Sequence, residues 1–167
     1  MSATTDYRYP GSRPFQDSDH DRRLFFGRDQ EQQSLLHLLL SEKLVVLFAK
    51  SGMGKTSLLN AGILQTLREK EFIPFRIRFN DPEMEPLQVV YAGIRDTVEQ
   101  HTLEYTPGEK NTLWQYFKTV EFWSAEDTLL TPVLILDQFE EFFAFYLPGK
   151  RKVFITQLAD LIKGRMP

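Results

Sequence analysis

The sequence has 167 residues, 42% of them apolar, and a net formal charge of −3, which suits one domain with a buried core and excludes a disordered chain. The charge provides no basic field for a phosphate backbone, so direct nucleic-acid binding is not expected. Cysteine is absent, the amino-terminal segment has no apolar signal-like stretch, and no apolar run approaches the ~20 residues that span a bilayer; we therefore expect a cytoplasmic protein without disulfides or membrane binding.

The amino-terminal part of the chain alternates polar segments with apolar patterns. We predict a loop-rich lead-in over residues 1–26 and a folded domain over 27–167. Asp29 and Gln32 form a capping-box pattern that predicts a helix over 29–41. The continuous apolar run at 44–48 predicts a strand buried on both faces, and the spacing of leucines after Lys55 predicts a helix to about Lys70.

The remaining part continues this alternation of strands and helices. Phe75, Ile77 and Phe79 alternate with Arg76 and Arg78, which predicts a strand near the sheet edge whose arginines form a solvated face. The other predicted elements are helices at 85–101, 113–123 and 150–163, the last capped by Gly164, a break at 106–108, and a buried strand at 133–136. This order predicts an α/β fold, a three-layer core with a mostly parallel sheet covered by helices.

A glycine-rich segment lies between the strand predicted at 44–48 and the helix predicted from Lys55. Glycines let successive backbone N–H groups point inward, and the start of a helix adds unpaired N–H groups and a positive dipole end, so such a loop binds phosphates. Lys55 would contact the β- and γ-phosphates, Thr56 would ligate magnesium, and Ser57 could reach the α-phosphate. Ala49 stands where the usual G-x-x-x-x-G-K-[ST] pattern has glycine, and this requires a negative φ. The predicted nucleotide-binding residues here are Lys50, Ser51, Gly52, Met53, Gly54, Lys55, Thr56 and Ser57.

Acidic residues follow the strand predicted at 133–136. The carboxyl ends of parallel strands share one edge of a sheet, so Asp137 is expected to open onto the same crevice as the phosphate loop and to hold magnesium, directly or through water. The alternative is that Asp137 caps the element that follows. One of Glu140 and Glu141, with Glu140 favoured, could orient the water that attacks the γ-phosphate, or both could be dipole partners at the start of a helix.

Four separated segments together resemble one family. They lie at residues 9–15, 24–29, 51–62 and 136–143, and their order and spacing are similar to those of the bacterial STAND ATPases, in particular the novel STAND type. These proteins are P-loop switches for signal transduction. The resemblance implies ATP or ADP with Mg²⁺ as cofactors, fused or partner effector and sensor domains, oligomerisation on activation, and a role in signalling such as bacterial antiviral defence.

The resemblance also implies individual roles. Phe26, Gly27 and Arg28 would lie near the adenine, although a hydrophobic staple before a helix explains the same residues. Asp137 would be the carboxylate on the metal side, and Glu140 and Glu141 would be the catalytic pair. The family places a further strand with a polar sensor residue after the last predicted helix, so we expect this sequence to be the amino-terminal part of a longer nucleotide-binding domain, with weak hydrolysis on its own.

These observations are compatible with three functions. The leading hypothesis is an ATP-binding, ATP-hydrolysing module of a STAND switch. The alternative is a module that holds nucleotide for interaction or oligomerisation without hydrolysing it. A third hypothesis, a P-loop kinase for a small molecule, is less favoured because residues 80–130 contain no lid segment rich in arginine and lysine.

Overall fold

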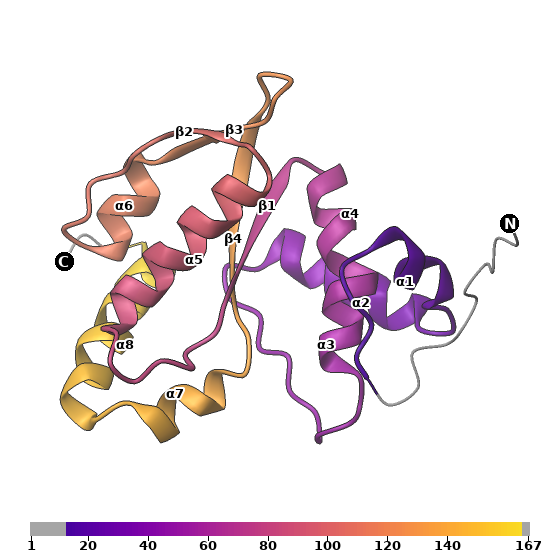
Figure 1. Ribbon diagram of the computed structural model, residues 1–167, viewed down its shortest axis with the longest axis horizontal. Coiled ribbons are helices and arrows are strands. Elements are labelled where there is room, and N and C mark those ends of the chain that lie inside the picture. Colours follow the sequence, from indigo (N-terminus) through magenta and orange to yellow (C-terminus); the bar gives the residue numbers. More distant parts are fainter. Residues whose placement is uncertain (1–12, 165–167) are drawn as a thin grey trace, which may run out of the picture. The chain divides into compact units, whose positions relative to one another are not determined.

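The computed structural model describes residues 13–164, which divide into two compact units that meet in the chain at Lys70 and Glu71 (Figure 1). The amino-terminal unit contains α1 (Asp19–Leu24), α2 (Asp29–Ser41), α3 (Lys55–Ser57), the π-helix η1 (Leu58–Ile63) and α4 (Leu64–Glu69). The carboxy-terminal unit contains β1 (Phe72–Ile77), α5 (Pro86–Gln100), β2 (Glu104–Thr106), α6 (Leu113–Thr119), β3 (Glu121–Trp123), β4 (Leu129–Leu136), α7 (Phe139–Phe145) and α8 (Pro148–Lys163). No helix in this part of the chain is long and apolar enough to cross a membrane.

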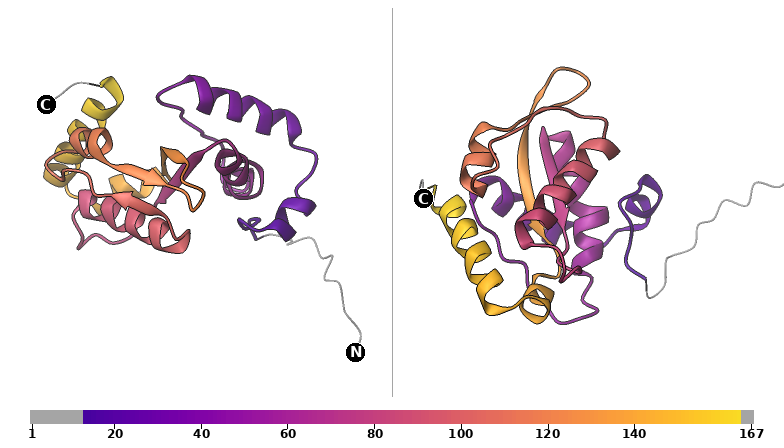
Figure 2. Two further views of the ribbon diagram at one scale, coloured as in Figure 1. Left: turned by 90° about the horizontal axis from the view of Figure 1, so that it is seen from above. Right: turned by 60° about the vertical axis from the view of Figure 1, so that its left-hand side comes forward.

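The amino-terminal unit is organised around one continuous helical run. The backbone stays in the right-handed helical region where α3 passes into η1 and where η1 passes into α4, so the predicted helix from Lys55 is confirmed. Its inward face is apolar, with Leu58, Ile63, Leu64 and Leu67 buried. Both α1 and α2 pack against η1, which Figure 2 shows from a second direction. The π-helical segment is a feature that the apolar spacing does not reveal.

The predicted helix at 29–41 is confirmed as α2, but its predicted cap is wrong. Arg28 is the N-cap residue, its side chain makes no capping hydrogen bond to the helix, and Asp29 is the first helical residue. The preceding Gly27 has φ +80°, a conformation that glycine adopts without strain, and it turns the chain so that Gln32 N donates to Arg28 O at 2.9 Å. The turn at Gly27 therefore sets where the helix begins, one residue earlier than the capping-box pattern suggests.

The predicted strand at 44–48 is not formed. Residues 44–50 have irregular backbone, and Leu44, Val46 and Phe48 are exposed, Phe48 to 86%. A strand exists only through hydrogen bonds to a neighbouring strand, and none of the described residues pairs with this run. The apolar composition indicates a preference for burial but does not supply a partner.

The four strands form a mixed sheet in the order β1-β4-β3-β2. β1 and β4 pair in parallel from Phe72 opposite Thr131 to Ile77 opposite Leu136, whereas β3 pairs antiparallel with both β4 and β2. The prediction of a mostly parallel sheet is therefore wrong. β3 and β4 are joined by a tight turn in which Ser124 N donates to Thr128 O, and a short connection of this kind permits only antiparallel neighbours. The predicted position of β1 at a sheet edge is confirmed.

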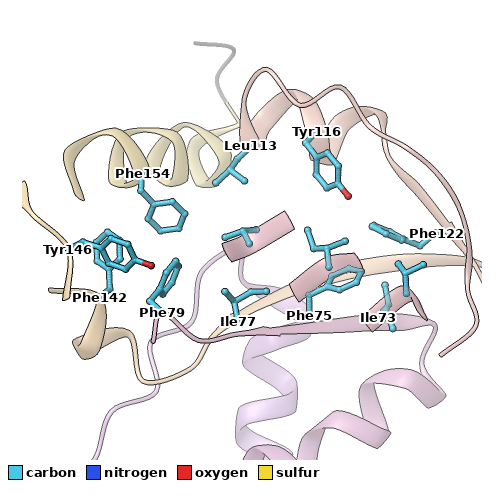
Figure 3. Close-up of a cluster of buried hydrophobic side chains, with 13 residues drawn as sticks. Ile73, Phe75, Ile77, Phe79, Leu113, Tyr116, Phe122, Phe142, Tyr146 and Phe154 are labelled. Atoms are coloured by element: carbon cyan, nitrogen blue, oxygen red, sulfur yellow. The ribbon is translucent and has the colours of Figure 1, made fainter. Parts of the chain in front are cut away.

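The core of the carboxy-terminal unit lies on one face of the sheet. Ile73, Phe75, Ile77 and Phe79 project from one side of β1 and its extension toward the helices (Figure 3). α5 covers this face through Val90, Ile94 and Val98, so the predicted helix at 85–101 is confirmed. The predicted helix at 113–123 is shorter than expected, because α6 ends at Thr119 and Phe122 is fully buried on β3, where its ring lies 4.8 Å from that of Phe75.

The carboxyl end of the unit follows the prediction closely. β4 contains the predicted strand at 133–136 but begins at Leu129. α8 contains the predicted helix at 150–163 and ends at Gly164, whose φ of +65° is the left-handed cap conformation. α7, between them, carries Phe142, which packs with Phe154 of α8 at a ring distance of 5.3 Å. The aromatic residues after Asp137 therefore serve first as core.

Candidate functional site

The glycine-rich loop turns at its two glycines, and its role in phosphate binding stays a prediction. Gly52 and Gly54 have φ of +80° and +75°, and Met53 N donates to Lys50 O at 3.3 Å to close a turn. The non-glycine residues with positive φ in the described chain are Glu71, Thr102, Asp127 and Gln138, so Ala49 has the negative φ expected of it. Lys50, Ser51, Gly52 and Met53 are exposed. Alternation of left- and right-handed residues at the start of a helix creates a concavity of backbone N–H groups, the usual site for an anion.

Lys55 and Thr56 open the helical run directly after this loop. Both are half-buried, and Gly54 is the N-cap residue, with Leu58 N donating to Gly54 O at 2.8 Å. Lys55 Nζ donates to the carbonyl of Ala49 at 2.7 Å, which folds the side chain back over the loop. A phosphate would present a stronger, charged acceptor at the same place. The role of Lys55 in phosphate binding stays a prediction.

Arg28 contacts the phosphate loop, which sequence reasoning did not foresee. Its Nη1 donates to the carbonyl of Met53 at 3.4 Å, and its Nε pairs with Glu31 at 2.8 Å. A methyl group built at Gly54 would lie 3.6 Å from the same Nη1. The guanidinium group therefore lies beside the backbone turn that leads into Lys55, although the resemblance implied a place near the adenine.

The two phenylalanines before Gly27 have opposite environments. Phe25 packs inside, with its ring 5.3 Å from that of Phe15, while Phe26 is 75% exposed. Phe26 does not pack on α2 as a hydrophobic staple would. Its exposed ring is available for stacking on a planar base, which stays a prediction.

Ser57 faces a segment that the phosphate-loop pattern does not include. Its Oγ accepts the backbone N–H of Phe15 at 3.1 Å, and Asn60, one turn further on, donates from Nδ2 to the carbonyl of Phe15 at 2.7 Å. All three residues are buried. Phe15 belongs to the conspicuous segment at 9–15, of which residues 9–12 lie outside the described part of the chain. The signal that could have found this contact is the serine and asparagine on the inner face of a helix that is otherwise apolar.

Asp137 lies at the carboxyl end of β4, where its backbone N–H donates to the carbonyl of Ile77 at 2.9 Å. Its carboxylate is engaged by two arginines: Oδ2 accepts from Arg76 Nε at 3.0 Å, from Arg76 Nη2 at 2.6 Å and from Arg78 Nε at 2.9 Å. Arg76 and Arg78 are partly exposed, as the predicted solvated face implies, but that prediction missed their pairing with Asp137. Register explains the contact, because Ile77 is opposite Leu136, and the next residues along both strands, Arg78 and Asp137, fall on the same face.

The arginines fix the ionisation state of Asp137. Burial alone would raise the pKa of its carboxyl, but the hydrogen bonds and charges of Arg76 and then Arg78 outweigh burial and hold the pKa below its usual value. The Asp137 side chain is 9% exposed, against 27% for Arg76 and 43% for Arg78. Two positive groups around one carboxylate make this cluster locally cationic. Asp137 is therefore ionised but already paired, and it caps no helix, since Gln138 is the N-cap residue of α7.

Glu140 and Glu141 lie in the first turn of α7. Glu140 is exposed and Glu141 is half-buried, and Glu141 N donates to Gln138 O at 2.9 Å. Carboxylates in a first turn interact favourably with the helix dipole, so this placement fits the interpretation as dipole partners and also leaves Glu140 accessible to solvent. Their catalytic role stays a prediction.

The predicted site residues fall into two groups. The loop, Lys55, Thr56 and Arg28 belong to the amino-terminal unit, and Asp137 with the two glutamates belongs to the carboxy-terminal unit. In the first group, Arg28 and Lys55 each donate a hydrogen bond to a carbonyl of the loop. The single crevice expected to join the groups stays a prediction.

Comparison with known families gives one match. The sequence profile of the family described as Novel STAND NTPase 1 matches residues 9–166, which is nearly the whole chain. The match includes the loop, the arginine of Phe-Gly-Arg and the acidic end of β4. Comparisons with curated proteins and with solved structures give no match.

Proposed function

The chain belongs to the Novel STAND NTPase 1 family, and from this premise we propose that it binds ATP with magnesium at the phosphate loop, as the nucleotide-binding module of a signal-transducing switch. The observation that carries this proposal is the conformation of the loop. Gly52 and Gly54 turn the backbone at the start of the helical run, and Lys55 follows directly. The unpaired N–H groups of a helix start and its positive dipole end favour phosphate oxygens.

Cationic side chains add to this backbone concavity. Lys55 would exchange the carbonyl of Ala49 for the β- and γ-phosphates, and Arg28 is held beside Gly54 through its contact with the Met53 carbonyl. Hydrogen bonds to a charged acceptor are stronger than those to a neutral carbonyl, so the exchange is favourable. The exposed loop leaves room for the triphosphate, and the exposed ring of Phe26 offers a stacking surface for the base.

The residues fit magnesium only in part. The hydroxyl of Thr56, at the start of the helical run, is a suitable oxygen ligand next to bound phosphates. Asp137 supplies the acidic oxygen, but its Oδ2 already accepts three N–H groups from Arg76 and Arg78. Magnesium would neutralise phosphate charge when bound. A metal ion at Oδ2 would displace these N–H groups, so we propose that Asp137 becomes a ligand after the phosphates have bound.

Titration of the protein with ATP, ADP and GTP in the presence of magnesium tests the proposal. Lys55→Met should weaken ATP binding roughly 10- to 150-fold, because a hydrogen bond to a charged group contributes about 1.5–3 kcal/mol. Lys70→Met is the matched control, since Lys70 is an exposed lysine at the other end of the same helical run and should leave the affinity unchanged. Equal affinities of wild type and Lys55→Met would remove the proposed site, and tighter binding of GTP would overturn the assignment of ATP.

Hydrolysis is a separate proposal that rests on Glu140 and Glu141. In-line attack by water would need one of these carboxylates to orient the nucleophile while Lys55 stabilises the phosphate charge. Phosphate release by the Glu140→Gln and Glu141→Gln variants tests this role, with nucleotide affinity measured alongside. If turnover is unchanged in both variants, or if the wild type binds ATP without releasing phosphate, the chain holds nucleotide for interaction or oligomerisation. Transfer of phosphate to an added small molecule would instead indicate a kinase.

A further inference from the structure

The segment before α1 is hydrogen-bonded to the helical run that begins with Lys55. We define residues 13–18 as the strap. At one end of the run, Ser57 and Asn60 hold the N–H and the C=O of Phe15. At the other end, Arg68 pairs with Asp17 of the strap, with Nη1 to Oδ1 at 3.1 Å. The strap therefore has anchors near both ends of the run.

Buried polar contacts carry the attachment. Phe15, Ser57 and Asn60 are exposed by only 4%, 8% and 4%. A buried amide or carbonyl that loses a hydrogen bond costs free energy, so these contacts stabilise the docked position of the strap. The attachment is thus specific for the backbone of the strap, and a change in the helix turn that carries Ser57 and Asn60 would break it.

We propose that Ser57 and Asn60 are positioning residues that couple the strap to the nucleotide, so that docking of the strap fixes the helix turn after Lys55 and Thr56. This inference rests on the proposed function of the loop. Ser57 directly follows the predicted magnesium ligand, and its contact with Phe15 uses a lone pair of its hydroxyl, which keeps a proton to donate. A phosphate that orders Thr56 and Ser57 therefore orders the acceptor on which the strap depends.

The local helix geometry supports this coupling. Asn60 lies inside η1, a six-residue π-helix, and such segments occur often at functional sites because they place side chains where an α-helix would not. The packing there is close, since a methyl group on Gly62 would lie 2.9 Å from Gln32 Cγ and 3.2 Å from Phe25. Phe25 in turn stacks edge-on against Phe15. The strap, η1 and the start of α2, which leads from Arg28, therefore form one packed group.

Reciprocity between the two binding events makes the proposal measurable. If nucleotide tightens docking of the strap by some factor, loss of docking must weaken nucleotide binding by the same factor. In the full chain, ATP with magnesium should slow amide hydrogen exchange over residues 15–17 by about 5-fold or more, the low end of the usual range for coupled sites. Ser57→Ala and Asn60→Asp should each abolish this slowing and weaken ATP binding by a similar factor.

Control variants separate coupling from simple loss of stability. Leu35→Val removes a buried methylene group from α2 without touching these hydrogen bonds, and should leave ATP affinity within about 2-fold of wild type at comparable stability. The inference fails if ATP binds to the wild type without slowing exchange in the strap and both variants bind ATP like the wild type. The strap would then only contribute packing, and the proposed nucleotide binding would stand. If the wild type binds no nucleotide, the proposed function fails and the inference falls with it. The exchange measurement on the wild type needs no variant to fold.

Discussion

The glycine-rich loop and the carboxyl end of β4 carry the two groups of residues predicted to bind nucleotide. The two groups differ in exposure and in how their charged side chains are paired. In the loop, Gly52 and Gly54 shape an exposed backbone, and the charged side chain of Lys55 donates to the carbonyl of Ala49. At the end of β4, Asp137 is buried and paired with Arg76 and Arg78. The loop is exposed to solvent, whereas the Asp137 carboxylate is already paired with two guanidinium groups. A motif therefore fixes where a functional group lies without fixing whether the group is available.

The largest effect should come from the core that supports the Asp137 region. Phe79 is fully buried and its ring contacts those of Phe139, Phe142, Tyr146 and Phe154. Phe79→Ala should lower the free energy of unfolding by about 3–5 kcal/mol, because it leaves a cavity between β1, α7 and α8. Denaturant unfolding would measure this, with Phe143→Ala as the control, which should lose clearly less because this ring is 48% exposed. A loss below about 1 kcal/mol would mean that the Asp137 region is not rigid.

The next effect concerns the paired carboxylate itself. Asp137→Asn leaves two guanidinium groups without their negative partner, which costs about 3–5 kcal/mol for a fully buried pair. Arg76 and Arg78 are partly exposed, and solvent screening reduces the expected loss to about 1–3 kcal/mol. Asp81→Asn is the matched control, at an exposed turn residue, and should change the stability by less than about 0.5 kcal/mol. If the two variants behave alike, the arginine cluster contributes no stability.

The same pairing predicts a pH dependence. The folded protein holds the pKa of Asp137 below its usual value, so the unfolded chain takes up this proton at higher pH than the folded chain does. The stabilisation by Asp137 is therefore fully present above the ordinary carboxyl pKa of about 4 and is lost as the pH falls through the lower folded value. The difference in unfolding free energy between wild type and Asp137→Asn should shrink from pH 7 toward pH 3. A constant difference would show that charge does not cause the effect.

Features that depend only on residues close together in the sequence were predicted well. Apolar periodicity located α2, α5 and the helical run from Lys55, and Gly164 marked the end of α8 because glycine adopts the left-handed cap without strain. The loop glycines were found for the same reason, since their φ values follow from local chemistry. In each case the residues themselves fix the conformation.

Features that depend on a distant partner were missed. Residues 120–123 continue a helical spacing, but burial of Phe122 against Phe75 and pairing with β4 make a strand of them. Arg76 and Arg78 look like a solvated face until the register of β1 and β4 places Asp137 beside them. The contact of Ser57 with Phe15 joins residues 42 positions apart. Local patterns carry no information on such pairings.

A smaller effect tests the backbone of the loop. Gly52 has φ +80° with no atom within 4 Å of an added methyl group, so Gly52→Ala introduces only backbone strain, about 1 kcal/mol of destabilisation. Gly149→Ala is the matched control, because Gly149 has equally open surroundings but lies in the first turn of α8, where alanine is favoured by about 0.5–1 kcal/mol. In thermal unfolding, Gly52→Ala should lower the melting temperature and Gly149→Ala should raise it. The same sign for both would contradict the left-handed turn in the loop.

The smallest effect concerns the apolar run before the loop. Val46→Thr replaces a methyl group with a hydroxyl of nearly the same size, and at a side chain that is 72% exposed it should change the stability by less than about 0.5 kcal/mol. Val90→Thr in α5 is the control, at a side chain with no exposure, where a buried hydroxyl should cost about 1–3 kcal/mol. Equilibrium unfolding of the two variants compares the exposed Val46 with the buried Val90. A loss at Val46 as large as that at Val90 would contradict the exposure of this apolar run.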